Sequence, residues 1–301
     1  MSVSENTDAM DRLIDGIDCL RSSPSVAQRI LSLTRDPNFK MKDVVACLER
    51  DPALATRILR VVNSSLYGLG RQISSVRHAA TYLGQKSLRM FAVTFSLVDT
   101  LTKGVHKTLA SDYWPRALAM ATVAGHLSKR LDGVEENDAY TAGLLADVGV
   151  LALAQAAADE YCPAYVENRH GPALINAEQQ LFGFAHPEFG ARLLEKWDLP
   201  EHMVIAVGDH HSKGSNPQPL SRCVVAGNLM GDALIAPAPI KLDLLREFLR
   251  SVFGANDADL AALAESCRAD MKESASIFGD SAYPEESSAE FLDMVLAAQP
   301  C

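Results

Sequence analysis

The helical spacing of apolar residues, which continues along the chain, limits the possible folds more than any other feature. Leu54, Ile58 and Val61 recur at steps of four and three residues, and Leu88 and Phe91 repeat the pattern further on. Residues at this spacing share one face of an α-helix, whereas a half-buried strand needs strict alternation. Such alternation is almost absent from the sequence. The sequence therefore predicts an all-α protein.

Local signals mark the ends of several predicted helices. Asp51 is followed by a proline, as expected for an N-cap and a first helical residue that needs no hydrogen-bonded N–H. Residues 63–75 are predicted to form a loop because glycines such as Gly68 interrupt the apolar pattern. The next helix is predicted to begin at a serine cap and to stop at Gly84.

The pattern divides the chain into four parts. Residues 1–17 are polar and acidic and are predicted to be a flexible N-terminus. Residues 18–110 form an N-terminal helical half, and residues 111–235 form a second helical half. An Ala-Pro-Ala-Pro linker then precedes a C-terminal helical extension at 240–301.

Composition predicts a cytoplasmic protein. With 48% hydrophobic residues the chain can bury a sizeable core. No stretch of about 18 apolar residues is free of charge, so we expect no membrane span and no membrane partner. The N-terminus has no apolar segment of the kind that signal peptides carry.

Charge and cysteine spacing exclude further classes. The net charge of -10 repels a phosphate backbone at long range, so we expect no nucleic-acid partner. The six cysteines contain no Cys-x-x-Cys pair, which argues against a zinc ribbon or a redox motif. We interpret them as reduced thiols.

Two segments carry side chains that could do chemistry. Residues 143–149 read Gly-Leu-Leu-Ala-Asp-Val-Gly and place one carboxylate, Asp147, in an otherwise apolar helix. The second candidate is a set of three histidines, His186, His210 and His211. A buried charge must have a partner, so a side chain elsewhere in the chain has to meet Asp147.

Several motifs spread along the chain point to one family: Pro24–Ala27, Asp51–Ala55, Arg57–Ser64, Tyr67–Gly68, Ile73–Ser75, Gly143–Gly149, His186–Gly190, Trp197–Pro200 and His210–His211. Over residues 18–235 the sequence resembles the HD-related output domain (HDOD) family, a relative of the HD metal-dependent phosphohydrolases. The resemblance implies an N-terminal helical bundle packed on an HD-like helical domain. The C-terminal extension lies outside it.

The resemblance also implies where a metal site would lie. In catalytic HD relatives a histidine, a His-Asp pair and a later aspartate hold metal ions that activate a water molecule. The vestigial metal-site positions here are Arg116, Ala146, Asp147, His186, His210, His211 and Asn228. Three of them have lost the expected ligand: Arg116, Ala146 and Asn228 replace two histidines and an aspartate. We therefore expect no catalytic residue, no bound metal and no cofactor.

Plainer roles are predicted for the remaining candidates. Asp147 is interpreted as a buried carboxylate that pairs with Arg116 or caps a helix. His210 and His211 are interpreted as a pair at a helix end, one packed and one solvated. His186 is expected to begin a helix, with a capping or hydrogen-bonding role.

The expected function is signal transduction by contact with other signalling proteins, tuned by a small anionic ligand. Two alternatives stay open: a residual metal-dependent phosphohydrolase, and a receptor for a cyclic dinucleotide or another anion. The candidates for a binding surface are Arg57, Arg60, Asn63, Tyr67 and Arg71. Arginine forks suit carboxylates and phosphates, but solvated helix faces with local salt bridges are the plainer interpretation of this basic region.

Overall fold

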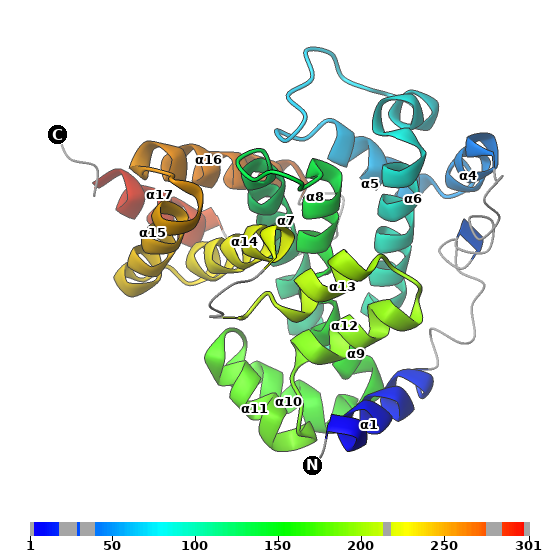
Figure 1. Cartoon of the computed structure of the whole chain (residues 1–301), viewed down its shortest axis with the longest axis vertical. Coiled ribbons are helices and arrows are strands. Elements are labelled where there is room, and N and C mark those ends of the chain that lie inside the picture. Colours follow the sequence, from blue (N-terminus) through cyan, green and yellow to red (C-terminus); the bar gives the residue numbers. More distant parts are fainter. Residues whose placement is uncertain (1–2, 18–28, 31–39, 213–217, 275–284, 298–301) are drawn as a thin grey trace. The chain divides into compact units, whose positions relative to one another are not determined.

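A computed structural model describes residues 3–17, 29–30, 40–212, 218–274 and 285–297 of the chain (Figure 1). All regular secondary structure in these ranges is helical, which confirms the predicted all-α class. The chain divides into two compact units. The small unit is Asp18–Lys103, and the large unit combines Met1–Ile17 with Gly104–Cys301.

The helices of the small unit are α4 (Met41–Leu48), α5 (Pro52–Val62) and α6 (Val76–Thr102). Those of the large unit are α1 (Val3–Asp15), α7 (Lys107–Ser128), α8 (Glu136–Leu145), α9 (Val148–Ala156), α10 (Ala158–Asn168), α11 (Pro172–Phe182), α12 (His186–Lys196), α13 (Glu201–Gly208), α14 (Pro219–Ile235), α15 (Pro239–Phe253), α16 (Asp257–Ser274) and α17 (Glu285–Ala297).

The predicted caps of the small unit are present. Asp51 accepts a hydrogen bond from the backbone N–H of Leu54 at 3.0 Å, and Ser75 accepts one from the N–H of His78 at 3.3 Å. Both bonds satisfy amides that the first helical turn leaves unpaired. Gly84 leaves the helical conformation at φ 75°, so α6 is kinked where the sequence predicts a helix end.

Residues 1–17 differ from the predicted flexible N-terminus, because most of them form α1. Met10, Ile14 and Ile17 are buried, and α1 contacts α9 and α12. Arg192 on α12 makes two hydrogen bonds of 2.7 Å to the carboxylate of Asp11. The acidic composition of this segment led to the prediction of a flexible terminus, although the segment also has an apolar face. Arg192 and Lys196 of α12 pair with its acidic side chains.

The predicted domain boundaries also differ from the observed division. The division falls between Lys103 and Gly104, whereas the sequence predicts a boundary at residue 110. The predicted extension at 240–301 belongs to the large unit, since α15 contacts α14 and α16 contacts α7. Thr122 on α7 donates a hydrogen bond to the buried Asp270 of α16 at 3.0 Å.

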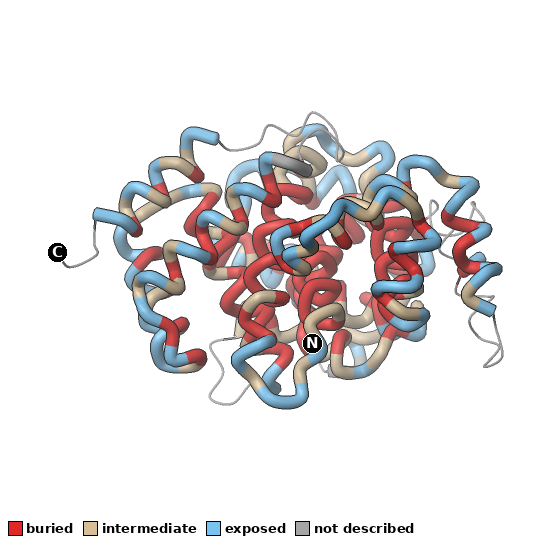
Figure 2. Tube along the Cα trace, turned by 90° about the horizontal axis from the view of Figure 1, so that it is seen from above, coloured by how far each residue is buried: buried red, intermediate tan, exposed pale blue. Residues whose placement is uncertain are grey.

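The core of the large unit forms around α7, whose residues from Tyr113 to Gly125 are all buried. Figure 2 draws buried residues in red and exposed residues in pale blue along the chain. Two glycines allow neighbouring helices to reach its backbone. A Cβ at Gly143 of α8 would lie 2.6 Å from the Cα of Ala121, and one at Gly227 of α14 would lie 2.5 Å from the carbonyl oxygen of Met120. These contacts fix α8 and α14 against α7 and so determine which side chains meet between them.

Within the described residues, one stretch, Glu136–Ala156, is long and apolar enough to span a membrane. It comprises α8 and α9, and 89% of its most apolar window is buried inside the protein. That burial is what the core of a water-soluble fold also produces. The turn between the two helices carries Asp147.

Candidate functional site

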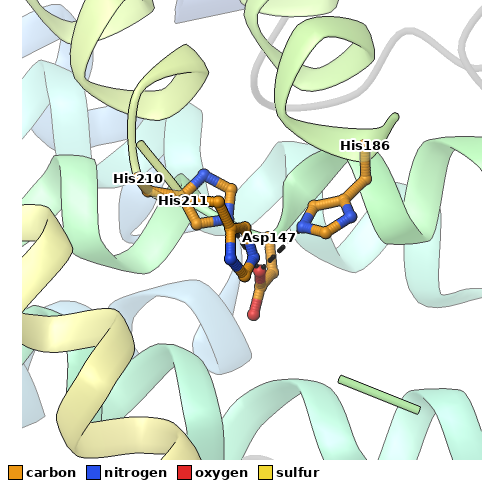
Figure 3. Close-up of side chains that lie close together, drawn as sticks. All are labelled: Asp147, His186, His210 and His211. Atoms are coloured by element: carbon orange, nitrogen blue, oxygen red, sulfur yellow. Dashed lines mark ion pairs between the residues drawn. The ribbon is translucent and has the colours of Figure 1, made fainter. Parts of the chain in front are cut away.

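Four of the predicted site residues lie together in the large unit. Asp147 precedes α9, His186 is the first residue of α12, and His210 and His211 follow the end of α13. One ligand atom from each of the four lies within 4.8 Å of the others. Figure 3 shows the three imidazole rings gathered around the carboxylate of Asp147.

Backbone packing brings Asp147 to His186. Gly149 lies so close to the start of α12 that an added Cβ would be 2.0 Å from the carbonyl oxygen of His186 and 2.9 Å from the backbone nitrogen of Gly190. Only a residue without a side chain permits this approach. The glycine that ends the 143–149 motif is therefore part of what builds the site.

Arg116 fills the other side of the Asp147 carboxylate. Its Nε donates a hydrogen bond of 2.5 Å to Oδ2 of Asp147. Its Nη1 donates to Asp232, and its Nη2 donates to Oδ1 of Asn228. The arginine is only 2% exposed. The predicted pairing of Asp147 with Arg116 is thus present, and Asn228 lies in the same cluster.

Asp232 is a member of this cluster that sequence reasoning missed. It lies four residues after Asn228 on α14, so the two side chains share one face of that helix. That spacing was a usable signal. The predicted position Ala146 is fully buried and supplies no ligand atom.

Charges in this cluster shift the protonation of its members. Burial would raise the pKa of Asp147, but the Arg116 guanidinium, together with the imidazoles of His210 and His186, holds it well below its ordinary value. Burial would likewise lower the pKa of Arg116, but the carboxylates of Asp147 and Asp232 raise it. Both groups of the pair are therefore charged.

Glu178 on α11 orients His186 and was also missed from sequence. Its Oε2 lies 2.7 Å from Nδ1 of His186 and accepts a 2.8 Å hydrogen bond from the backbone N–H of the same residue. Its Oε1 accepts a 2.7 Å hydrogen bond from Tyr161. Burial lowers the pKa of His186, but Glu178 and Asp147 outweigh it and raise that pKa. The predicted hydrogen-bonding role of His186 is present.

The two later histidines have different surroundings. His210 is fully buried, and its Nδ1 lies 2.6 Å from the carbonyl oxygen of Val207. His211 is partly buried, and its Nδ1 lies 3.3 Å from Nδ2 of Asn228. Burial, with a smaller effect of the neighbouring His210, lowers the pKa of His211. The packed histidine of the predicted pair is therefore His210. His211 was predicted to be solvated, but it is partly buried and contacts Asn228 of the cluster.

Two nitrogens of this cluster have no hydrogen-bond partner among the described residues: Nε2 of His186 and Nε2 of His210. They lie 3.6 Å and 3.2 Å from Oδ1 of Asp147, without hydrogen-bond geometry. In each ring Nδ1 faces an oxygen acceptor, and Nε2 faces the carboxylate of Asp147. Imidazole nitrogens and a carboxylate oxygen are the kinds of atom that bind transition metals, so by residue type and spacing these residues fit a metal ion.

The space beside the arginine is small. A cavity of about 10 Å³ borders Tyr113, Arg116, Asp147 and Tyr165. A cavity of this volume holds about one water molecule. A phosphate ester does not fit there.

The predicted binding-surface residues of the small unit have mixed roles. Arg57 is ion-paired with Asp99, and Asn63 pins the loop by exchanging two hydrogen bonds with the backbone of Ile73, at 2.7 and 2.8 Å. Arg71 is exposed and Arg60 is half-buried.

Tyr67, the remaining candidate, packs at the surface of the small unit. Its ring meets that of the exposed Tyr82 edge to face, with centroids 5.7 Å apart. One local salt bridge in this basic region joins Arg77 to Glu49 at 2.9 Å. Arg71 is exposed and Arg60 and Tyr67 are partly exposed, whereas the contacts of Arg57 and Asn63 lie within the unit.

Comparison with known proteins places the fold among solved structures. An HDOD domain protein of unknown function from Geobacter sulfurreducens is 25% identical, with a TM-score of 0.62 over 98% of this chain and 99% of that one. A candidate signal transduction protein from Marinobacter aquaeolei VT8 is 21% identical, with a TM-score of 0.59 over 97% of this chain and 66% of that one. The second likeness shows the fold alone.

Sequence comparison gives the family. An uncharacterized protein of Treponema pallidum (strain Nichols) is 26% identical over 235 residues, which cover 75% of this chain and 45% of that protein. The match thus spans less than half the length of this curated relative. The family model of the HDOD domain matches residues 20–213. The chain therefore belongs to the HDOD domain family.

Proposed function

We propose that the chain is a non-catalytic signal-transduction protein that acts by protein–protein contact. The observation that carries the proposal is Arg116, whose guanidinium pairs with Asp147, Asp232 and Asn228 in the centre of the HD-like site. The buried guanidinium of Arg116 repels a metal cation, and it pairs with Asp147, the carboxylate that a catalytic metal centre would use. The cavity of about 10 Å³ beside it leaves no room for a phosphate ester.

The distribution of charge supports a partner surface on the small unit. Residues 18–103 carry 13 lysines and arginines against 6 aspartates and glutamates, a net charge of +7. The rest of the chain carries 15 against 32, a net charge of -17. Complementary charge steers association and fixes the partner more than it adds affinity. A partner with an acidic face fits the exposed arginines and tyrosines of this unit.

The proposal is tested by pairing an activity assay with partner capture. The full chain, purified without a metal-affinity tag, should hydrolyse neither phosphodiesters nor phosphomonoesters with Mg²⁺, Mn²⁺ or Zn²⁺. In cells that express it naturally, crosslinking should capture a defined partner that the double variant Arg60→Glu/Arg71→Glu loses. The control is Arg250→Glu, an exposed reversal in the acidic unit, which should retain the partner.

Two results would contradict the proposal. Hydrolysis that Asp147→Asn abolishes would mean that the site is catalytic. Unchanged capture by the double variant, with its helical spectrum intact, would remove the small unit as the contact surface.

A residual metal-dependent phosphohydrolase is the second candidate, favoured by the clustering of four ligand atoms within 4.8 Å. Asp147, His186, His210 and His211 would hold the metal, which would supply a Lewis acid and an activated water molecule. Arg116 opposes this candidate because it takes up Oδ2 of the one carboxylate in the set. A receptor that binds an anion through Arg116 has less support, since the guanidinium is buried and already paired.

A further inference from the structure

We infer that two copies of this chain associate through α15 (Pro239–Phe253), with the two helices side by side in opposite directions. The inference goes beyond the proposed function, which concerns a partner of the small unit. It also concerns a helix outside residues 20–213, the part of the chain that the family model matches.

The first argument is an apolar ridge on the solvent side of α15. Four apolar residues at steps of four form one row along the helix: Ile240, Leu244, Phe248 and Val252. Ile240 is 66% exposed and Leu244 is 50% exposed, and the other two are partly exposed. Among the large hydrophobic residues that are exposed in the described ranges, these two are the pair that shares a helix. Adjacent exposed apolar side chains of this kind mark a contact surface.

The ridge is held on a firmly packed helix. The other face of α15 is buried through Leu242, Leu245 and Leu249, and the helix contacts α14 and α16. Figure 1 shows α15 at the outside of the large unit, beside α14. The exposed face is therefore presented to the solvent by a helix that the core already fixes.

The second argument is the order of the charges beside the ridge. Asp243 and Glu247 lie one turn apart, and an arginine follows each after three residues, Arg246 and Arg250. In an antiparallel pair related by a two-fold axis, the same flank of both helices meets. With the axis between residues 246 and 247, Asp243 faces the second copy's Arg250, and Glu247 faces the second copy's Arg246. A parallel pair would bring like charges to the same height.

The same register also matches the apolar ridges. It brings Leu244 beside the second copy's Phe248, and Ile240 beside the second copy's Val252. The face is therefore complementary to itself in both charge and polarity, as a two-fold contact requires. This complementarity selects a second copy of the chain as the occupant of the ridge.

The charged side chains are available for such contacts. Among the described residues neither Glu247 nor Arg250 forms an ion pair, and Asp243 approaches Arg246 only at 3.7 Å. Arg246 is held by Asp257 at 2.7 Å. A surface hollow of about 330 Å³ borders these side chains and leaves room for those of the second copy. The pair of Asp243 with the second copy's Arg250 therefore carries the prediction.

The contact is small. α15 has 15 residues and is about 22 Å long, so a pair of such helices buries less than about 1,200 Å² in total, the range of weak complexes. The net charge of -17 outside residues 18–103 also repels a second copy at long range. We therefore expect a dimer that forms and separates with concentration.

Association is measured by sedimentation velocity on the full chain over a range of concentrations. The mass should rise from that of one chain to that of two and no further, because a two-fold contact is closed. Leu244→Lys places two lysines in the apolar contact and should weaken association at least about tenfold. The matched control is Leu181→Lys on α11, where the leucine is 47% exposed, and it should associate like the parent. Circular dichroism checks that both variants fold.

Charge reversal tests the direction of the helices. Asp243→Lys and Arg250→Glu should each weaken association about fivefold, because each change removes two ion pairs from the dimer. The combined variant Asp243→Lys/Arg250→Glu restores opposite charges, so its affinity should return to within about twofold of the parent. Arg250→Glu should still capture the partner of the small unit, so failure of this inference and failure of the proposed function give different results.

Four outcomes would overturn the inference. They are a parent that stays a single chain at every concentration, masses that continue to grow beyond two chains, equal association by folded Leu244→Lys and Leu181→Lys, and a combined charge variant that associates no better than its single variants.

Discussion

Replacing Arg116 with methionine should lower the free energy of unfolding by about 3–5 kcal/mol, the range found when one partner of a buried ion pair is removed. The change leaves Asp147 and Asp232 facing each other without their shared cation. Arg116 is 2% exposed, so water cannot replace the lost hydrogen bonds. Chemical denaturation followed by circular dichroism measures the loss.

Two further variants make this prediction specific to the buried pair. Arg130→Met removes an arginine that pairs with Asp259 at the surface, at 2.5 Å, where the side chains are 38% and 28% exposed. Its cost should stay within about 1 kcal/mol. Adding Asp147→Asn to Arg116→Met should recover part of the loss, because it removes one unpaired charge. If the two arginine variants lose equal stability, Arg116 does not have the role assigned to it.

Replacing Gly149 with alanine should be nearly as damaging, at about 3 kcal/mol or more. Alanine in a helix normally stabilises by roughly 0.5–1 kcal/mol relative to glycine, so the expected sign is reversed. The reason is the Cβ position, 2.0 Å from the carbonyl oxygen of His186. Relieving that clash requires α9 and α12 to separate, and overpacking of this kind is destabilising.

The matched control is Gly208→Ala in α13. Its added Cβ would meet the Cβ of Ala191 at 3.4 Å, which is ordinary contact. The stability of this variant should stay within about 1 kcal/mol of the parent. Thermal unfolding of both variants measures the difference. Equal melting temperatures for the two would contradict the close approach of α9 and α12.

Much of the fold could be predicted from the sequence because helices depend on interactions between residues close together in the chain. The helices follow from apolar residues three and four positions apart, and the caps at Asp51 and Ser75 follow from side chains that reach an amide three residues later. The apolar face of α1 obeyed the same rule, but the acidic composition of the segment concealed it. Its order also needs Arg192, which lies 181 residues from Asp11.

The candidate site was readable only in part. Asp147 could be predicted as a site residue because it is the one carboxylate in the apolar segment 143–149. The HD resemblance then assigned Arg116 to the same site. Glu178 and Asp232 stand in no motif that sequence reasoning recognised. The fold places Glu178 against His186 and Asp232 against Arg116. For Asp232 the four-residue spacing from Asn228 on α14 was a signal that could have been used.

The sequence by itself determined the helical class, some helix ends, the HDOD family and the need for a partner to Asp147, because each depends on local spacing or on residue type. Only the tertiary structure decided which side chains meet in the candidate site. Arg116 meets Asp147 across 31 residues of chain and Asn228 across 112. Those meetings depend on the approach of α8 and α14 to α7 at Gly143 and Gly227, where backbones touch because no side chain separates them. Contacts between distant backbones leave no periodic signal in a single sequence, so the orientation of the histidines had to come from the fold.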